Sequence, residues 1–241
     1  MIINAARRAF QNLFAAETRS VFWKMLGLTL MVLIALWFAV RGLFIWLAVP
    51  WLDSMMQTMP GWAGWITFTL EILSGFGLAF ALVFLISPVT AIIAGLFLDD
   101  VAEVIEKEDY PGDPGGRAMP LGEAIASSIK FFGVVILGNI IALMLLLVPG
   151  VNLIAFFMVN GYLLGREFFE FAAMRFRTPT EARAFRSKHS TKVFLAGLVI
   201  AAFLAIPFLN LLTPLFAASL MVHLHKSVSK KDPSFSNQLG R

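Results

Sequence analysis

The sequence predicts an all-α integral membrane protein with two long spanning helices and two hydrophobic helical hairpins, at least the second of them re-entrant. Of its 241 residues, 59% are hydrophobic and 14% are charged, and the mean hydropathy is +0.82. Soluble domains contain about 45–50% apolar and about 25% charged residues, so this chain has too little polar surface to cover a water-exposed globule. We expect one membrane domain over residues 1–228 and a polar tail over residues 229–241.

Several classes of site have no matching pattern in the sequence. The chain has no cysteine, which excludes disulfides, thiolate metal sites and a cysteine nucleophile. His189, His223 and His225 are not spaced as zinc ligands, and neither a catalytic triad nor a phosphate-binding loop is present. The sequence therefore predicts neither an enzyme nor a metal site, and no cofactor.

The two spanning helices are predicted over residues 21–52 and 61–98, because each apolar stretch exceeds the roughly 20 residues that cross a bilayer. Each carries a charge inside the membrane. Arg41 and Glu71 lie at matching distances from the connecting turn, so antiparallel packing places them at similar depth and predicts an ion pair. The alternative is that Arg41 reaches the headgroups while Glu71 faces the helix interface.

Two amphipathic segments are predicted outside the hydrocarbon core. Residues 1–17 form an interfacial helix, because Phe10 and Phe14 share one face while Arg7 lies elsewhere. Residues 99–130 form a cytoplasmic acidic helix and a loop rich in proline and glycine.

The two hairpins are predicted over residues 131–165 and 193–225, which are apolar stretches interrupted by a proline. The two interruptions share a pattern in which a β-branched residue and proline precede an apolar residue, asparagine and leucine. The shared pattern predicts equivalent hairpin tips, which line the pore at Pro149, Asn152, Pro207 and Asn210.

The length of the hairpin arms predicts how far they enter the bilayer. The arm over residues 193–206 reaches only about 21 Å, short of a hydrocarbon core of about 30 Å, so the second hairpin is interpreted as re-entrant. The arms of the first hairpin, about 27 Å and about 24 Å long, leave both re-entrance and full spanning open. Tips inside a bilayer need protein or water around them, which predicts packing between the hairpins or against another subunit of a homo-oligomer.

The basic residues define the sidedness of the chain. Every lysine and arginine except Arg41 falls on one side of the predicted topology. The positive-inside rule makes that side cytoplasmic, which places both termini inside a bacterial inner membrane. The same distribution explains the net charge of +4 without a nucleic-acid partner.

Residues 18–20, ahead of the first long helix, are a candidate anion site. A helix N-terminus offers free N–H groups, Arg19 adds a guanidinium group, and the hydroxyls of Thr18 and Ser20 lie beside it. This combination suits a tetrahedral oxyanion. The alternative is an ordinary helix start with a basic flank.

A second charged group follows the first hairpin, at the start of a basic cytoplasmic segment over residues 166–192. Arg166 and Glu170 are four residues apart and are spaced to pair across one helical turn, with Glu167 beside them. We interpret the group either as a solvated helix face or as the cytoplasmic mouth of an anion pathway.

The order of these features resembles the CysZ family of the etoposide-induced-protein superfamily. The resemblance covers about residues 3–228 and includes Thr18-Arg19-Ser20, Ile86-Ser87-Pro88, Gly161 to Glu167 and Ile206 to Asn210. It implies two spanning helices, two partly inserted hairpins, oligomerisation and uptake of sulfate for cysteine synthesis. In the family, a Gly-Leu-Arg-like corner is the sulfate site. Here Arg19 is retained, and Glu17 stands at the glycine position.

Together these features predict an inner-membrane permease or channel for sulfate or a similar oxyanion. The sequence has no nucleotide-binding motif, so a gradient or a partner protein must supply any energy. The alternative is a non-transporting membrane scaffold whose hairpins wedge into one leaflet.

Overall fold

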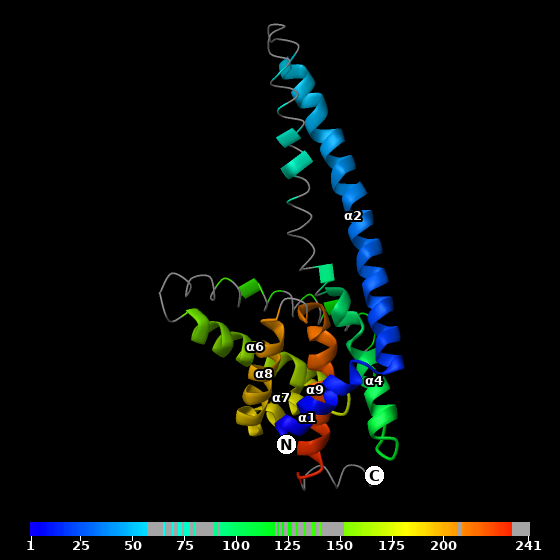
Figure 1. The fold of residues 1–241 in the computed structure, drawn as a ribbon, viewed down its shortest axis with the longest axis vertical. Coiled ribbons are helices and arrows are strands. Elements are labelled where there is room, and N and C mark those ends of the chain that lie inside the picture. Colours follow the sequence, from blue (N-terminus) through cyan, green and yellow to red (C-terminus); the bar gives the residue numbers. More distant parts are fainter. Residues whose placement is uncertain are drawn as a thin grey trace. The chain divides into compact units, whose positions relative to one another are not determined.

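The computed structural model describes residues 1–56, 89–90, 92–118, 120, 152–206 and 209–232, with single residues between 65 and 80 and between 122 and 140 (Figure 1). All secondary-structure elements within these residues are helical. The chain divides into two compact units. One unit contains residues 1–25 and 94–241, and the other contains residues 26–93.

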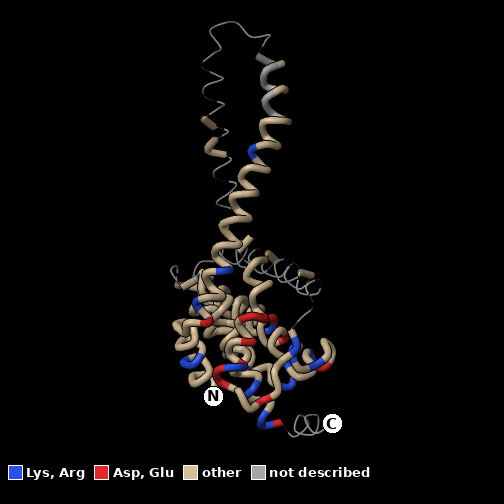
Figure 2. The backbone as a smooth tube through the Cα atoms, turned by 90° about the vertical axis from the view of Figure 1, so that its right-hand side faces the viewer, with Lys and Arg blue, Asp and Glu red and all other residues tan. Residues whose placement is uncertain are grey.

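The second unit is dominated by α2 (Ala16–Met56), which begins in the first unit. Its segment Ala16–Leu47 is the one unbroken helix in the described residues that is long and apolar enough to cross a membrane. Large apolar side chains such as Ile34, Phe38 and Trp46 are exposed along it, as expected for a lipid-facing surface. The described part of this unit is almost entirely tan in Figure 2, so it carries few charged residues.

Most of the predicted second spanning helix lies outside the described residues. Those that are described between positions 65 and 80, such as Trp65 and Phe76, are helical. Glu71 is outside the described set, while Arg41 is exposed on α2. The predicted Arg41–Glu71 ion pair therefore stays a prediction.

The first unit is built around α9 (Thr213–Ser229), which is buried along almost its whole length. It contacts α1 (Ile2–Asn12), α4 (Leu98–Asp109), α6 (Asn152–Met174) and α8 (Ser190–Leu204). Small residues in the middle of the helix allow these neighbours to approach, while larger apolar side chains fill the spaces between them. These large buried side chains are Leu215, Leu220, Met221 and Leu224.

Helices α6 and α8 cross in close backbone contact. Gly161 and Gly165, one turn apart on α6, face Gly197 on α8. A Cβ atom on Gly165 would lie 2.7 Å from the carbonyl oxygen of Val193, so only glycine fits at this position. The spacing is the small-xxx-small pattern that lets apolar helices approach closely.

A buried ion cluster joins the end of α6 to α4. Arg175 donates from Nε to Glu106 Oε1 at 2.9 Å and also contacts the Asp99 carboxylate. Gly116, in the proline- and glycine-rich loop, donates its N–H to Glu106 Oε2 at 2.7 Å. The cluster therefore fastens the loop to both helices, and its charges are compensated inside the protein.

The N-terminal helix α1 is fastened by polar contacts at its end. Asn12 donates to Asp109 at 2.7 Å and lies 3.3 Å from Nε2 of His223 on α9. Ala5 and Ala9 of α1 are buried one turn apart on its inner face. The N- and C-terminal helices are thus packed together.

The segment after α6 folds into two helices at a right angle. Helix α7 (Pro179–Lys188) bends by 90° into α8 at His189. After α8 the chain turns through the 3₁₀ helix η2 (Asn210–Leu212) into α9. Helices α8 and α9 are in contact with one another, while the hairpin predicted over residues 193–225 and its insertion into a bilayer stay predictions.

Helix α6 runs without interruption from Asn152 to Met174, across the predicted end of the first hairpin at residue 165. The two glycines inside it are contact points for α8 and do not end the helix. The basic segment predicted over residues 166–192 therefore begins inside α6.

Candidate functional site

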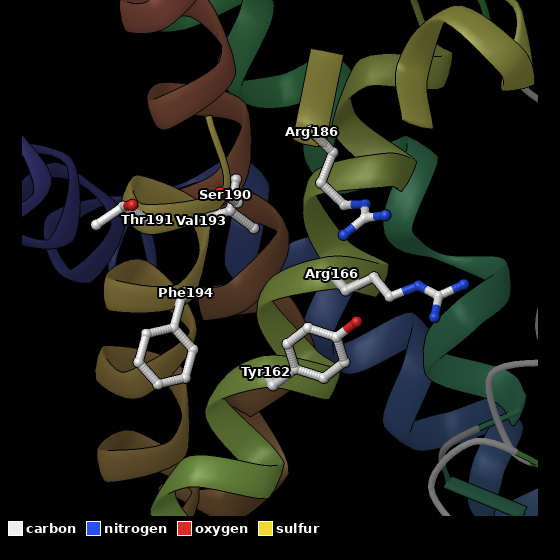
Figure 3. Close-up of a pocket in the computed structure, with 7 residues that line it drawn as sticks. All are labelled: Tyr162, Arg166, Arg186, Ser190, Thr191, Val193 and Phe194. Atoms are coloured by element: carbon white, nitrogen blue, oxygen red, sulfur yellow. The ribbon is translucent and has the colours of Figure 1, made fainter. Parts of the chain in front are cut away.

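A cavity of about 290 Å³ lies where α6, α7 and α8 meet. Its lining combines two arginines with three hydroxyl-bearing and two apolar side chains. Figure 3 shows the guanidinium groups of Arg166 and Arg186 extending to the same side, with the Tyr162 hydroxyl directed toward Arg166. The lining residues are Tyr162, Arg166, Arg186, Ser190, Thr191, Val193 and Phe194.

Two features of the fold bring these residues together. The glycine contact between α6 and α8 sets Tyr162 and Arg166 beside the first turns of α8. The bend at His189 then places Arg186, near the end of α7, beside Ser190 at the start of α8.

Helix α7 is itself held in place at both ends. At its start, Thr178 and Glu181 form a reciprocal capping box, in which each side chain accepts a hydrogen bond from the other's backbone N–H. Near its end, the buried ring of Phe185 stacks on Phe169 of α6 with centroids 6.0 Å apart. Arg186 follows Phe185 directly and is fixed by this packing.

One buried carboxylate links the arginines. Glu170 Oε1 lies 3.5 Å from Arg166 Nε and 2.8 Å from Arg186 Nε, and its side chain is 7% exposed. Its second oxygen lies 3.9 Å from Nε of Arg183, which is largely exposed. Glu167 contacts Arg166 at 3.7 Å. The group contains three guanidinium groups and two carboxylates and has a net positive charge.

The hydrogen-bonding capacity of this group is not used up. Arg166 Nε, Arg186 Nε and Glu170 Oε1 are buried without an aligned hydrogen-bond partner in the described part of the chain. The contacts between them are therefore ion pairs whose N–H groups do not point at the oxygen. Buried donors of this kind need an acceptor, and a guanidinium group offers five N–H donors.

The start of α8 adds to the positive potential. The helix has no side-chain cap at its N-terminus. A helix leaves its first N–H groups without intrahelical partners and carries a partial positive charge at that end. Ser190 and Thr191 add hydroxyl groups in its first turn. The cavity thus combines the donor types that bind oxyanions.

Comparison with known proteins assigns the chain to a family. The sequence matches the family described as sulfate transporter CysZ/etoposide-induced protein 2.4 over residues 5–214. The chain belongs to this family. No curated protein is significantly similar to this CysZ-family chain. Its family is of the transporter type, and the family together with the apolar helix α2 identifies a membrane protein.

The predicted anion corner of this CysZ-family chain is described in full. Thr18 is buried, and its hydroxyl has no hydrogen-bond partner among the described residues, whereas Arg19 and Ser20 are exposed. The N–H of Arg19 donates to the Ala15 carbonyl at 3.0 Å, so Arg19 lies inside the helix and not at its free end. Successive helix positions point about 100° apart, so the structure does not bring the three side chains to one point.

The electrostatic surroundings of that corner are acidic on one side. Glu17 and Glu108 are within hydrogen-bonding reach of one another. The Glu at the family's glycine position is therefore part of a pair of carboxyl groups between the start of α2 and the end of α4. Their charge opposes that of Arg19.

The other predicted site residues divide into two groups. Arg166, Glu167 and Glu170 are brought together at the cavity, as the spacing of Arg166 and Glu170 predicts. The hairpin-tip prediction lies outside the described residues: Pro149 and Pro207 are not described, and neither are the side chains of Asn152 and Asn210.

Sequence reasoning missed the second half of the cavity. Arg186, Ser190 and Thr191 appear in the sequence as part of a basic segment with no anion signature. The available signal was Thr178-x-x-Glu181, a capping-box pattern that marks a new helix and hence a turn before it. In the described residues there is no cluster of three or more side chains suited to a metal ion.

Proposed function

We propose that this chain is a permease or channel for sulfate or a similar oxyanion, and that the cavity between α6, α7 and α8 holds the anion. The observation that carries the proposal is the pair Arg166 and Arg186. Both have buried Nε–H groups without an aligned acceptor at a cavity in a family named for sulfate transport.

The chemistry of the lining favours a tetrahedral oxyanion over other small ligands. A guanidinium group donates two parallel N–H bonds to an oxyanion, and two such groups address different oxygens. Ser190 and Tyr162 supply hydroxyl donors at the same cavity. Its volume is at the small end of the range for ligand pockets, about 300–1,000 Å³.

The proposed setting follows the sequence analysis. We place the protein in a bacterial inner membrane with both termini in the cytoplasm, where imported sulfate supplies cysteine synthesis. A homo-oligomer in membrane lipid surrounds the hairpin tips at Pro149, Asn152, Pro207 and Asn210. Arg19 offers a second anion contact at the cytoplasmic start of α2. The gradient of an ion or of sulfate itself drives uptake.

The test is uptake of labelled sulfate into liposomes that contain the purified full-length protein. We expect saturable uptake that falls at least tenfold in Arg186→Gln and in Arg166→Gln. The matched control is Lys107→Gln, which removes one positive charge from an exposed pair on α4. Uptake that is equal in wild type and both arginine variants would reject the cavity as the site.

A parallel variant, Arg19→Ala, tests the second contact separately. Reduced uptake in this variant alone would move the anion site to the start of α2. No uptake above empty liposomes, under several ion gradients, would reject the permease.

The alternative function is a membrane scaffold, which one observation favours. Ile3 and Phe10 are exposed on the outer face of α1, opposite the buried Ala5 and Ala9, and Phe14 is exposed just after the helix ends. An apolar face of this kind lies at a membrane surface and needs no transport activity. The scaffold therefore predicts vesicle binding without sulfate uptake.

A further inference from the structure

We infer that Glu170 is a built-in competitor for the oxyanion and sets the preference of the site by anion charge. The inference rests on the proposed function and deepens it. The Glu170 carboxylate contacts both arginines and neutralises part of the positive charge that would attract an anion to the cavity beside them.

The contacts of Glu170 carry this inference. A single oxygen, Oε1, lies within 3.5 Å of Arg166 Nε and 2.8 Å of Arg186 Nε. The side chain is nine-tenths buried, so its charge is shielded from water and acts on anything that enters the adjacent cavity. Both arginines line that cavity, whereas Glu170 does not.

The misalignment of these contacts separates Glu170 from a purely structural ion pair. In the Arg175–Glu106 pair the N–H points at the oxygen and forms a hydrogen bond. Around Glu170, by contrast, the nitrogen and the oxygen are close but not aligned. The arginines are thus electrostatically neutralised in part, while their Nε–H groups lack an aligned acceptor.

Charge counting gives the direction of the effect. Arg166 and Arg186 together with Glu170 leave one net positive charge at the cavity, and Glu167 and Arg183 on the same two helices offset one another. Repulsion between Glu170 and a bound anion grows in proportion to the charge of the anion. If the Glu170 carboxylate weakens the binding of a monoanion by a given factor, it weakens the binding of a dianion by the square of that factor.

The test compares sulfate with nitrate in Glu170→Gln. The uncharged side chain keeps the shape of glutamate and removes the negative charge. For a charge about 6 Å from the anion in a partly solvated site, we expect nitrate affinity to rise about fivefold and sulfate affinity about 25-fold. Isothermal titration calorimetry on the purified full-length protein measures both.

The matched control is Glu103→Gln, which removes one negative charge from an exposed pair on α4 and should leave both affinities unchanged. An equal gain for nitrate and sulfate in Glu170→Gln, or no gain, would overturn the inference. Absence of sulfate binding in wild type and in Glu170→Gln would instead overturn the proposed function, so the two failures are distinguishable.

A second variant covers the case in which Glu170→Gln does not fold. Glu170→Asp keeps the charge but withdraws it from the arginines by one methylene group. We expect sulfate affinity to rise, by less than in Glu170→Gln, and again by more than nitrate affinity. Unchanged or weaker sulfate binding in Glu170→Asp would contradict the inference.

Discussion

A Cβ atom on Gly197 of α8 would lie 2.8 Å from the Cα atom of Gly165 on α6 and would overlap the carbonyl oxygen of Gly161. Three glycines thus allow two apolar helices to touch through their backbones. The cavity lies beside this contact, because Arg166 follows Gly165 and Val193 lies one turn before Gly197. The packing of the two helices and the shape of the cavity therefore depend on the same few atoms.

The first prediction concerns Gly197→Ala. The added methyl group has no space, so the helices must separate, and we expect a loss of about 1–3 kcal/mol of unfolding free energy. Sulfate binding should weaken as well, because the two sides of the cavity move apart. Thermal unfolding in detergent measures the stability. The control is Gly27→Ala, where a Cβ meets nothing within 4 Å; equal melting of both variants would contradict the packing argument.

The second prediction concerns Arg175→Met. Burial lowers the pKa of Arg175, but its contacts with Glu106 and Asp99 outweigh burial and raise the pKa above its ordinary value. The arginine is therefore always charged, and its removal leaves Glu106 buried without its counter-ion. We expect a loss of about 3–5 kcal/mol of unfolding free energy, measured by thermal unfolding.

The control for this substitution is Lys107→Gln, whose pair with Glu103 is exposed and is expected to contribute less than about 1 kcal/mol. A similarly small change in unfolding free energy in both variants would show that the buried ion cluster does not stabilise the fold. Sulfate uptake serves as a second readout, since an unfolded variant loses it entirely.

The third prediction concerns pH and the start of α7. Hydrogen bonds from the Thr178 backbone N–H and then from its hydroxyl lower the pKa of Glu181. A lowered carboxyl pKa gives stability that is present above the pKa of the unfolded chain, about 4.5, and lost as the pH falls through the folded value. Thermal unfolding from pH 6 to pH 3 should show the difference between wild type and Glu181→Gln shrink below pH 4.5.

Thr178→Ala provides a check at constant pH. Loss of the cap should reduce the unfolding free energy by about 1 kcal/mol. Because α7 carries Arg186, a looser helix start should also weaken sulfate binding. A pH-independent difference between wild type and Glu181→Gln would show that the capping box does not form in solution.

The fourth prediction concerns Ser190→Ala at the start of α8. Removal of one hydroxyl donor at an exposed position should lower sulfate affinity about threefold to tenfold, with stability unchanged. The control is Ser187→Ala, an exposed serine of α7 that does not line the cavity. Equal affinities for the two variants would exclude Ser190 as an anion contact.

The sequence was sufficient for the helical class and for part of the site. The apolar stretch of α2 and the four-residue spacing of Arg166 and Glu170 are local features, and both are found in the structure. The partnership of Arg166 with Arg186 is not local. It depends on the bend at His189 and on the contact between Gly165 and Gly197. Neither the bend nor the contact between the two helices produces a repeating pattern of residues in the sequence.

The glycines of α6 show how tertiary contact offsets a weak local helix preference. Glycine inside a helix weakens it by about 1 kcal/mol relative to alanine. Here the loss is offset by tertiary contact with α8, which requires that no side chain be present. Only knowledge of the partner helix distinguishes a glycine that ends a helix from one that packs against another.

The burial of α9 has a consequence for the timing of folding during synthesis. Helix α9 is synthesised long after α1, yet the two helices pack against each other. Buried residues of α1 such as Ala5 and Ala9 therefore have no final partner while the segments between the two helices are translated. The first unit cannot complete its fold before α9 has been synthesised, and a ribosome-bound chain that ends before Thr213 should be markedly more sensitive to protease than the released protein.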